Sequence, residues 1–255
     1  MWFFRLVLVG VMIMARGAPD DSNVKVGKDL YRLDDLAELA VRLGSIVTYN
    51  RYGSVLMLDG FESGLNAWDT NTTGVGSEVG ISGLVSYQGQ VCCRVKTGIN
   101  PNPYAGFHKY LPPVSEGRVG LQTCFSFGDT INTLLFQMTY GKADVRYHFI
   151  VVYDYVAQEL QYCSAPGVYT PFATGVALFA ASNFWHNFKM VVDLESKEHV
   201  RCSLDNVVYD MTGLAPTPAA GVVATFLSPV IRVSGVGLVD AYGYFDNLIV
   251  TYNEF

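Results

Sequence analysis

The chain has 255 residues, half of them hydrophobic, so it has enough apolar side chains for one large core and is not disordered throughout. Its net charge is -6, and a basic surface for nucleic acid is therefore missing, so we expect no nucleic-acid partner. The 25 glycines, 16 tyrosines and 15 phenylalanines are typical of many short strands joined by tight turns.

Residues 1–18 form an apolar leader with two interpretations. Arg5 precedes an apolar run, and a signal peptide cleaved after Gly17 would fit this pattern. Alternatively, Met14 is the true start and the preceding residues are a mis-called extension. The run is too short for a comfortable membrane span. We expect a secreted or virion-surface protein under the first interpretation and a cytoplasmic one under the second.

Residues 19–54 are predicted to form an N-terminal arm with one helix at about residues 33–43. A glycine at position 44 suits the left-handed stop of such a helix. We expect the helix to dock on the following domain or on a neighbouring subunit, which would make the protein a homo-oligomer. The apolar residues of the helix recur at helical spacing: Leu33, Leu36, Leu39, Ala40 and Leu43.

From residue 45 onward the hydrophobic pattern changes to that of strands. Turn residues separate the segments at short intervals, and no helical pattern lies between them, so an antiparallel sandwich or barrel is favoured over a parallel α/β sheet. The predicted strands are 45–49, 55–61, 91–96, 106–111, 118–127, 132–140, 144–154, 158–163, 186–194, 199–204, 207–210, 229–234 and 243–252.

Three parts of the chain resemble a known superfamily. They are residues 58–68 (LDGFESGLNAW), residues 185–195 (WHNFKMVVDLE) with the following 200–210 (VRCSLDNVVYD), and residues 244–251 (YFDNLIVT). Together they resemble the concanavalin A-like lectin/glucanase superfamily, the jelly-roll sandwich also found in laminin-G-like domains. The resemblance implies an all-β jelly roll of two antiparallel sheets over residues 55–255, in which the opening and closing strands pair.

The resemblance also implies a candidate calcium site. Glu62 and Asp246 would approach each other if the first and last strands pair, and Asn247 follows directly. Calcium takes six to eight oxygen ligands, to which these side chains and nearby carbonyl groups could contribute. In the alternative interpretation the same side chains cap strand ends by hydrogen bonds.

Glucanases of this superfamily carry three alternating acidic residues on one strand, and this chain lacks them. The nearest candidates are Asp193, Glu195 and Glu198, but Val191 stands where the nucleophile would be. We therefore expect no enzymatic activity. An acidic pair in a groove would favour an atypical glycoside hydrolase instead.

Sugar binding needs aromatic rings for the apolar sugar face and polar groups for the hydroxyls. We take Asn102, Tyr104, Tyr140 and Tyr169 as candidate ligand-binding residues, with ordinary loop packing as the alternative.

The five cysteines show no zinc-binding spacing. We expect them to be small buried residues, and one or two disulfides could form if the protein is secreted. They are Cys92, Cys93, Cys124, Cys163 and Cys202.

Three functions remain open from the sequence. The first is a non-enzymatic lectin-like module that binds a carbohydrate or surface glycan. The second is a structural or assembly protein of a viral or phage particle or a surface layer, in which the N-terminal arm contacts neighbouring subunits. The third is an atypical glycoside hydrolase. A flat aromatic platform would favour the first, and a large apolar patch beside the arm would favour the second.

Overall fold

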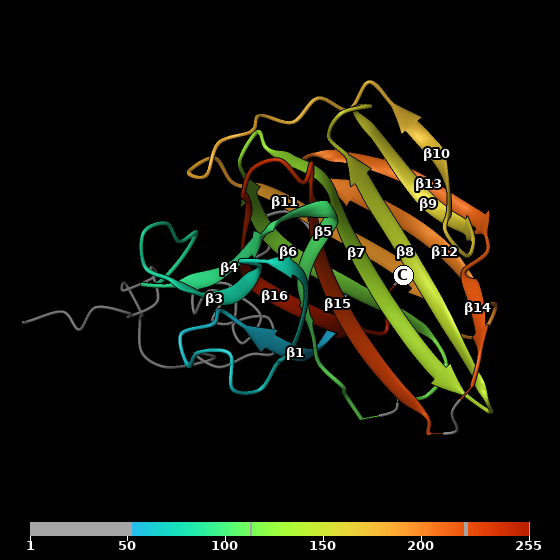
Figure 1. Ribbon diagram of the computed structural model, residues 1–255. Helices are drawn as coiled ribbons and strands as arrows, with labels where there is room; N and C mark the ends of the chain where they lie inside the picture. The colour runs from blue at the N-terminus through green and yellow to red at the C-terminus, as the bar shows by residue number, and fades with distance from the viewer. Residues whose placement is uncertain (1–52, 113, 222–223, 255) are drawn as a thin grey trace, which may run out of the picture. The chain divides into compact units, whose positions relative to one another are not determined.

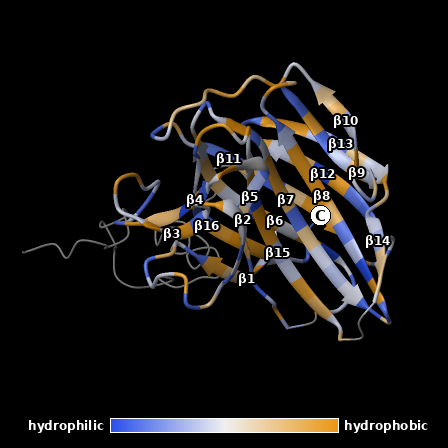
Figure 2. Cartoon of the chain, viewed as in Figure 1, coloured by the Kyte–Doolittle hydropathy of each residue, from blue (hydrophilic) through white to orange (hydrophobic). Residues whose placement is uncertain are grey.

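The strands of this protein form because apolar side chains recur at every second position. Along β7 (Ile131–Lys142), Leu134 and Phe136 belong to the main core, whereas Leu135 and Gln137 point to the opposite side of the sheet. Figure 2 shows this alternation of hydrophobic and hydrophilic residues along the long strands. A sheet with this pattern buries one face against a partner sheet.

The computed structural model describes residues 53–112, 114–221 and 224–254, all of which belong to one unit spanning residues 43–255. These residues form two antiparallel sheets (Figure 1). Sheet A contains, in spatial order, β13 (Val207–Leu214), β12 (Glu198–Leu204), β11 (His186–Asp193), β6 (Arg118–Phe127), β16 (Ala241–Tyr252), β4 (Cys92–Thr97) and β3 (Glu78–Ser82), with β1 (Ser54–Asp59) also paired with β16.

Sheet B is the second layer, and its long strands β8, β7 and β15 are neighbours (Figure 1). Its order is β10 (Val168–Thr174), β9 (Glu159–Ala165), β8 (Val145–Asp154), β7, β15 (Phe226–Gly235), β5 (Ile99–His108) and β2 (Asp69–Val75), with β14 (Thr217–Ala220) also paired with β8.

The core lies between the two sheets and is rich in aromatic rings. Phe136 of sheet B stacks on Phe188 of sheet A, with 3.9 Å between the ring centroids. Phe107 of sheet B meets Phe245 of sheet A edge to face at 5.9 Å. All four rings are fully buried, so the two layers are held together mainly by apolar burial.

The prediction of an all-β sandwich of two antiparallel sheets is confirmed, and the opening and closing strands pair as expected. Trp68 is buried against Phe61 and Phe107, and its indole N–H donates to Asp59 at 2.8 Å. Strands β2, β3, β10 and β14 were not predicted. The first three are edge strands and β14 has only four residues, so these segments lack a continuous apolar face.

The predicted leader at residues 1–18, the helix at about residues 33–43 and the strand at 45–49 lie outside the described residues, as does nearly all of the arm. The assembly alternative depends on that arm and stays a prediction. Within the described ranges there is no helix that could cross a membrane.

All five cysteines are buried and unpaired. Burial raises the pKa of the Cys92 thiol to about 12, with the charge of Asp246 as a second cause. Burial likewise raises the pKa values of Cys124 and Cys202 well above the ordinary range. These thiols therefore stay protonated at neutral pH and act as small core residues.

Candidate functional site

The candidate site lies on the outer face of sheet B, the side that points away from the shared core. Antiparallel pairing sets the side chains of this face in rows across the strands. One row runs from Gly106 to Arg232, Leu135, Val152 and Gln161. Strands β5, β15, β7, β8 and β9 each contribute one residue to it, so residues distant in the chain become neighbours.

The next row runs parallel to the first, two residues further along each strand. It joins Tyr104, Ser234, Thr133, Asp154 and Glu159 in the same order of strands. Members of both rows line a hollow of about 310 Å³. Together with Tyr169 of β10, these residues make the hollow span six strands of one sheet.

The floor of the hollow is apolar although it faces away from the main core. Leu135 and Val152 line the hollow and form a small buried cluster with Ile150 and Cys163. Amide and hydroxyl side chains surround this floor, including Asn132 and others from both rows. An apolar base with a polar rim is the usual composition of a small-ligand site.

Three of the four predicted ligand-binding residues line this one hollow. They are Asn102, Tyr104 and Tyr169. Tyr169 is 43% exposed, and Asn102 adopts a left-handed backbone conformation with φ of 54°. Burial raises the pKa of Tyr169, while the positive charge of Arg232 opposes the shift. The two tyrosines and the arginine thus line the same hollow.

Tyr104 is held from two sides. Its backbone N–H donates to the Thr73 hydroxyl oxygen at 3.1 Å, and the guanidinium carbon of Arg232 lies 4.4 Å from the centroid of its ring. This cation–π contact orders both side chains at the edge of the hollow.

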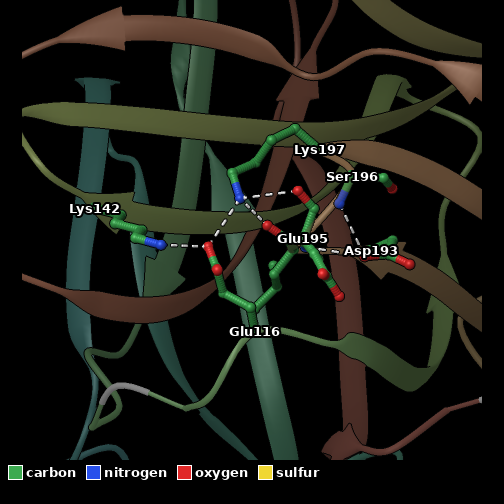
Figure 3. A network of polar contacts seen from close by, with 7 residues as sticks. Glu116, Lys142, Asp193, Glu195, Ser196 and Lys197 are labelled. Carbon is green, nitrogen blue, oxygen red and sulfur yellow. Dashed lines mark hydrogen bonds and ion pairs between the residues drawn. The ribbon is translucent and has the colours of Figure 1, made fainter.

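Tyr140, the fourth predicted residue, does not line the hollow. It is 2% exposed and belongs to the main core. The ammonium group of Lys197 lies 5.3 Å from its ring centroid, and Glu116 accepts hydrogen bonds from Lys197 and Lys142 at 3.1 and 2.6 Å (Figure 3). Tyr140 therefore packs inside the sandwich, where a ligand at the hollow does not reach it.

A polar cluster lies further along the outer face of sheet B. The amide nitrogen of Gln137 donates to the Thr139 hydroxyl oxygen at 2.6 Å and lies 3.0 Å from Nδ1 of His148. Burial lowers the pKa of His148, and the charge of Arg146 adds to the shift. The imidazole is therefore neutral at neutral pH and offers hydrogen bonds rather than a charge.

The three predicted calcium ligands come close together, but backbone N–H groups occupy both carboxylate oxygens of Asp246 and one of Glu62. Glu62 accepts hydrogen bonds from the amides of residues 90–91, at 2.8 and 3.2 Å. Asp246 accepts from the amides of residues 87–88, both at 3.0 Å, and from that of Asn247 at 2.7 Å. A cation would face N–H hydrogens here, so this arrangement does not fit calcium. The described part of the chain contains no group of three or more His, Cys, Asp or Glu side chains that could hold a metal.

Asp193 and Glu195, the nearest match to a glucanase motif, form a turn between β11 and β12 (Figure 3). One oxygen of Asp193 accepts hydrogen bonds from the amides of Glu195 and Ser196, at 2.9 and 3.2 Å. Partial burial opposes ionisation, but these bonds and Arg118 lower the pKa of Asp193. The carboxylate of Asp193 therefore stabilises the turn through these hydrogen bonds.

Sequence reasoning missed Arg232, Gln161, Asn132 and Asp154, which also line the hollow. Their neighbours across the sheet come from distant strands, so no local motif marks them. One feature of the sequence could have indicated Arg232. It is a charged residue between two apolar ones in a strand pattern, so it points away from the core.

No protein-family model matches the sequence, and no curated protein matches it. Solved structures of other proteins do match this chain. The cellulose-induced protein Cip1 aligns over 76% of this chain and 96% of its own, with 14% identity and a TM-score of 0.53. The endo-β-1,4-glucuronan lyase of the fungus Trichoderma reesei aligns over 78% of this chain and 96% of its own, with 12% identity and a TM-score of 0.52.

A carbohydrate esterase of the Shiga toxin-encoding bacteriophage phi24B aligns over 79% of this chain and 100% of its own, with 12% identity and a TM-score of 0.52. These structures share the antiparallel β-sandwich fold of this chain. At these identities the likeness establishes the fold alone and carries no residue role over to this chain.

Proposed function

We propose that this jelly roll binds carbohydrate in the hollow on the outer face of sheet B. The observation that carries the proposal is that two tyrosine rings and several amide side chains meet there over an apolar floor. Aromatic rings stack on the apolar face of a sugar, and amides bond its hydroxyl groups. A volume of about 310 Å³ is at the lower end of the range for small-ligand sites, about 300–1,000 Å³.

The names of the structural neighbours support carbohydrate as the ligand class. Two of the three are named as a glucuronan lyase and a carbohydrate esterase, and the third is named for its induction by cellulose. In our proposal the partner is a glycan or a cell-surface polymer, and the protein meets it outside the cell or on a virion surface.

The proposal assigns binding without turnover. Val191 takes the place of the glucanase nucleophile, and Asp193 holds a turn. A glycan array with the full-length protein, followed by calorimetric titration of the strongest ligand, tests the proposal. We expect Tyr104→Ala and Tyr169→Ala each to weaken binding by about 10-fold.

Tyr87→Ala serves as the matched control. Tyr87 is 38% exposed, comparable to Tyr169, but it packs on Trp185, away from sheet B. Its replacement should leave the affinity unchanged. If no glycan binds, or if all three variants bind like the native protein, the proposed site is wrong.

A second candidate function, glycoside hydrolysis, is favoured by one acidic pair. Asp154 and Glu159 lie directly opposite each other on β8 and β9, and Asp154 lines the hollow. Directly opposed side chains on one face have Cβ atoms about 4.5–5.5 Å apart, so their carboxyl groups can reach the separation of about 5–5.5 Å found in retaining glycosidases. Incubation with the bound glycan and mass spectrometry of the products decides between the two functions. A hydrolase would release shorter sugars, and Asp154→Asn would abolish their release.

A further inference from the structure

Arg232 is a cation without an anionic partner at the edge of the hollow. Its guanidinium makes no ion pair and no hydrogen bond within residues 53–112, 114–221 and 224–254. Its described contact is a cation–π interaction with the Tyr104 ring. Arginine carries its charge at every physiological pH and presents five N–H donors in a planar fork. These donors are therefore available to a ligand.

Most other cations of the described residues are neutralised by a carboxylate. Arg118 pairs with Asp193 at 3.3 Å and Lys96 with Asp240 at 2.8 Å, for example. The other cations in such ion pairs are Arg94, Lys142, Lys189, Lys197 and Arg201. Among the described cations, Arg232, Arg146 and Lys109 make no ion pair, and of these three Arg232 is the one that lines the hollow.

The carboxylate within the hollow that could compete for Arg232 is Asp154. It lies on β8, two strands from β15 with β7 between them. Neighbouring strands are about 4.8 Å apart and Asp154 is offset from Arg232 by two residues along the strands, so the two side chains leave the sheet about 12 Å from each other. Asp154 also accepts a hydrogen bond from the backbone N–H of Ala157 at 2.9 Å. Between the two charges lies the apolar floor of Leu135 and Val152.

From this geometry we infer that the sugar bound in the hollow is acidic and that Arg232 binds its carboxylate. The inference rests on the proposed carbohydrate function and names its ligand class, a uronic acid. The planar fork of arginine matches a carboxylate in bidentate geometry. Tyr104 holds the fork in place and lowers the entropy lost on binding. Tyr169, on the other side of the floor, presents a ring to the sugar.

Pairs of ligands that differ chiefly in charge test the inference. We would titrate the full-length protein with tetrasaccharides of glucuronic, galacturonic and mannuronic acid, and with the methyl ester of each. The ester removes the charge and adds one methyl group. We expect at least one acid to bind about 10- to 100-fold more tightly than its ester, because a bidentate charged contact is lost.

Two substitutions test whether the positive charge of Arg232 binds the carboxylate of the sugar. Arg232→Gln should reduce the affinity for the acid to that for its ester and leave the ester affinity unchanged. Arg146→Gln is the matched control, because Arg146 lies on the same face, makes no described ion pair and does not line the hollow. It is six residues from Val152 along β8, about 20 Å. Its replacement should leave both affinities as they are.

The outcomes separate this inference from the function on which it rests. Equal affinities for acid and ester would overturn the acidic ligand and leave carbohydrate binding intact. Equal losses in Arg232→Gln and Arg146→Gln would also overturn it, since the effect would then be general electrostatics. If no sugar binds, charged or neutral, both proposals are wrong. The comparison of acid with ester uses the native protein, so it decides the question even if a variant fails to fold.

Discussion

The guanidinium of Arg232 lies 4.4 Å from the centre of the Tyr104 ring, and both side chains line the hollow on sheet B. Tyr104 is on β5 and Arg232 on β15, and the two residues are more than 120 positions apart in the chain. Pairing of Tyr104 with Ser234 and of Gly106 with Arg232 makes them diagonal neighbours. The contact therefore depends on the register of these two strands.

Replacing Tyr104 separates the role of its ring from that of its hydroxyl. Tyr104→Phe keeps the ring that faces Arg232, so the affinity for the bound glycan should stay within about 2-fold of native. Tyr104→Leu removes the ring and should weaken binding by about 10-fold. Calorimetric titration measures both. Equal losses in the two variants would instead make the hydroxyl the important group.

Gly106 allows β5 and β15 to approach closely beneath Arg232. A Cβ at this position would lie 2.4 Å from the carbonyl oxygen of Ile231 and 3.0 Å from Cα of Arg232. Gly106→Ala should therefore lower the free energy of unfolding by about 1–3 kcal/mol and weaken glycan binding. Urea unfolding measures the first effect. Gly128→Ala is the control, because nothing lies within 4 Å of its added Cβ, and it should be nearly neutral.

The buried carboxyl of Asp246 should make stability depend on pH. Burial raises its pKa to about 6, although backbone amides oppose the shift and the charge of Glu62 adds to it. The unfolded chain has the ordinary pKa, near 3.8. Between these two pKa values the folded protein binds a proton that the unfolded chain does not. The carboxyl therefore contributes to the free energy of unfolding below about pH 4, and this contribution is lost as the pH rises through 6.

Asp246→Asn removes this titration. The native protein should lose about 2–3 kcal/mol of unfolding free energy relative to the variant between pH 4 and pH 7. Denaturant titrations at intervals of pH measure the difference. A difference that is constant across this range would contradict the assignment to Asp246.

Calcium should leave the thermal stability unchanged. The amides of residues 87–88 and of Asn247 already occupy both carboxylate oxygens of Asp246, and those of residues 90–91 occupy one oxygen of Glu62. A ligand that binds the folded state raises the melting temperature, so melting with millimolar calcium and with a chelator should agree within about 1 °C. A rise of several degrees that Asp246→Asn abolishes would restore the calcium site.

Alternation along single strands is the part of this fold that the sequence predicts well. Leu134 and Phe136 face the core because every second residue of an antiparallel strand points to the same side, and that rule is local. The edge strand Asp69–Val75 was not predicted, because it consists mostly of threonine and asparagine and shows no alternation of apolar residues. Tyr140 has the composition of a binding residue, but its even position on β7 places it with Leu134 and Phe136 in the core.

The sequence by itself determined that this protein is an all-β sandwich, that its opening and closing strands pair, and that Asn102, Tyr104 and Tyr169 suit a ligand. Only the tertiary structure decided that these three residues share one hollow with Arg232 and Asp154. The physical reason is that a strand specifies which side each residue faces, whereas the order and register of the eight strands in each sheet come from contacts between distant segments.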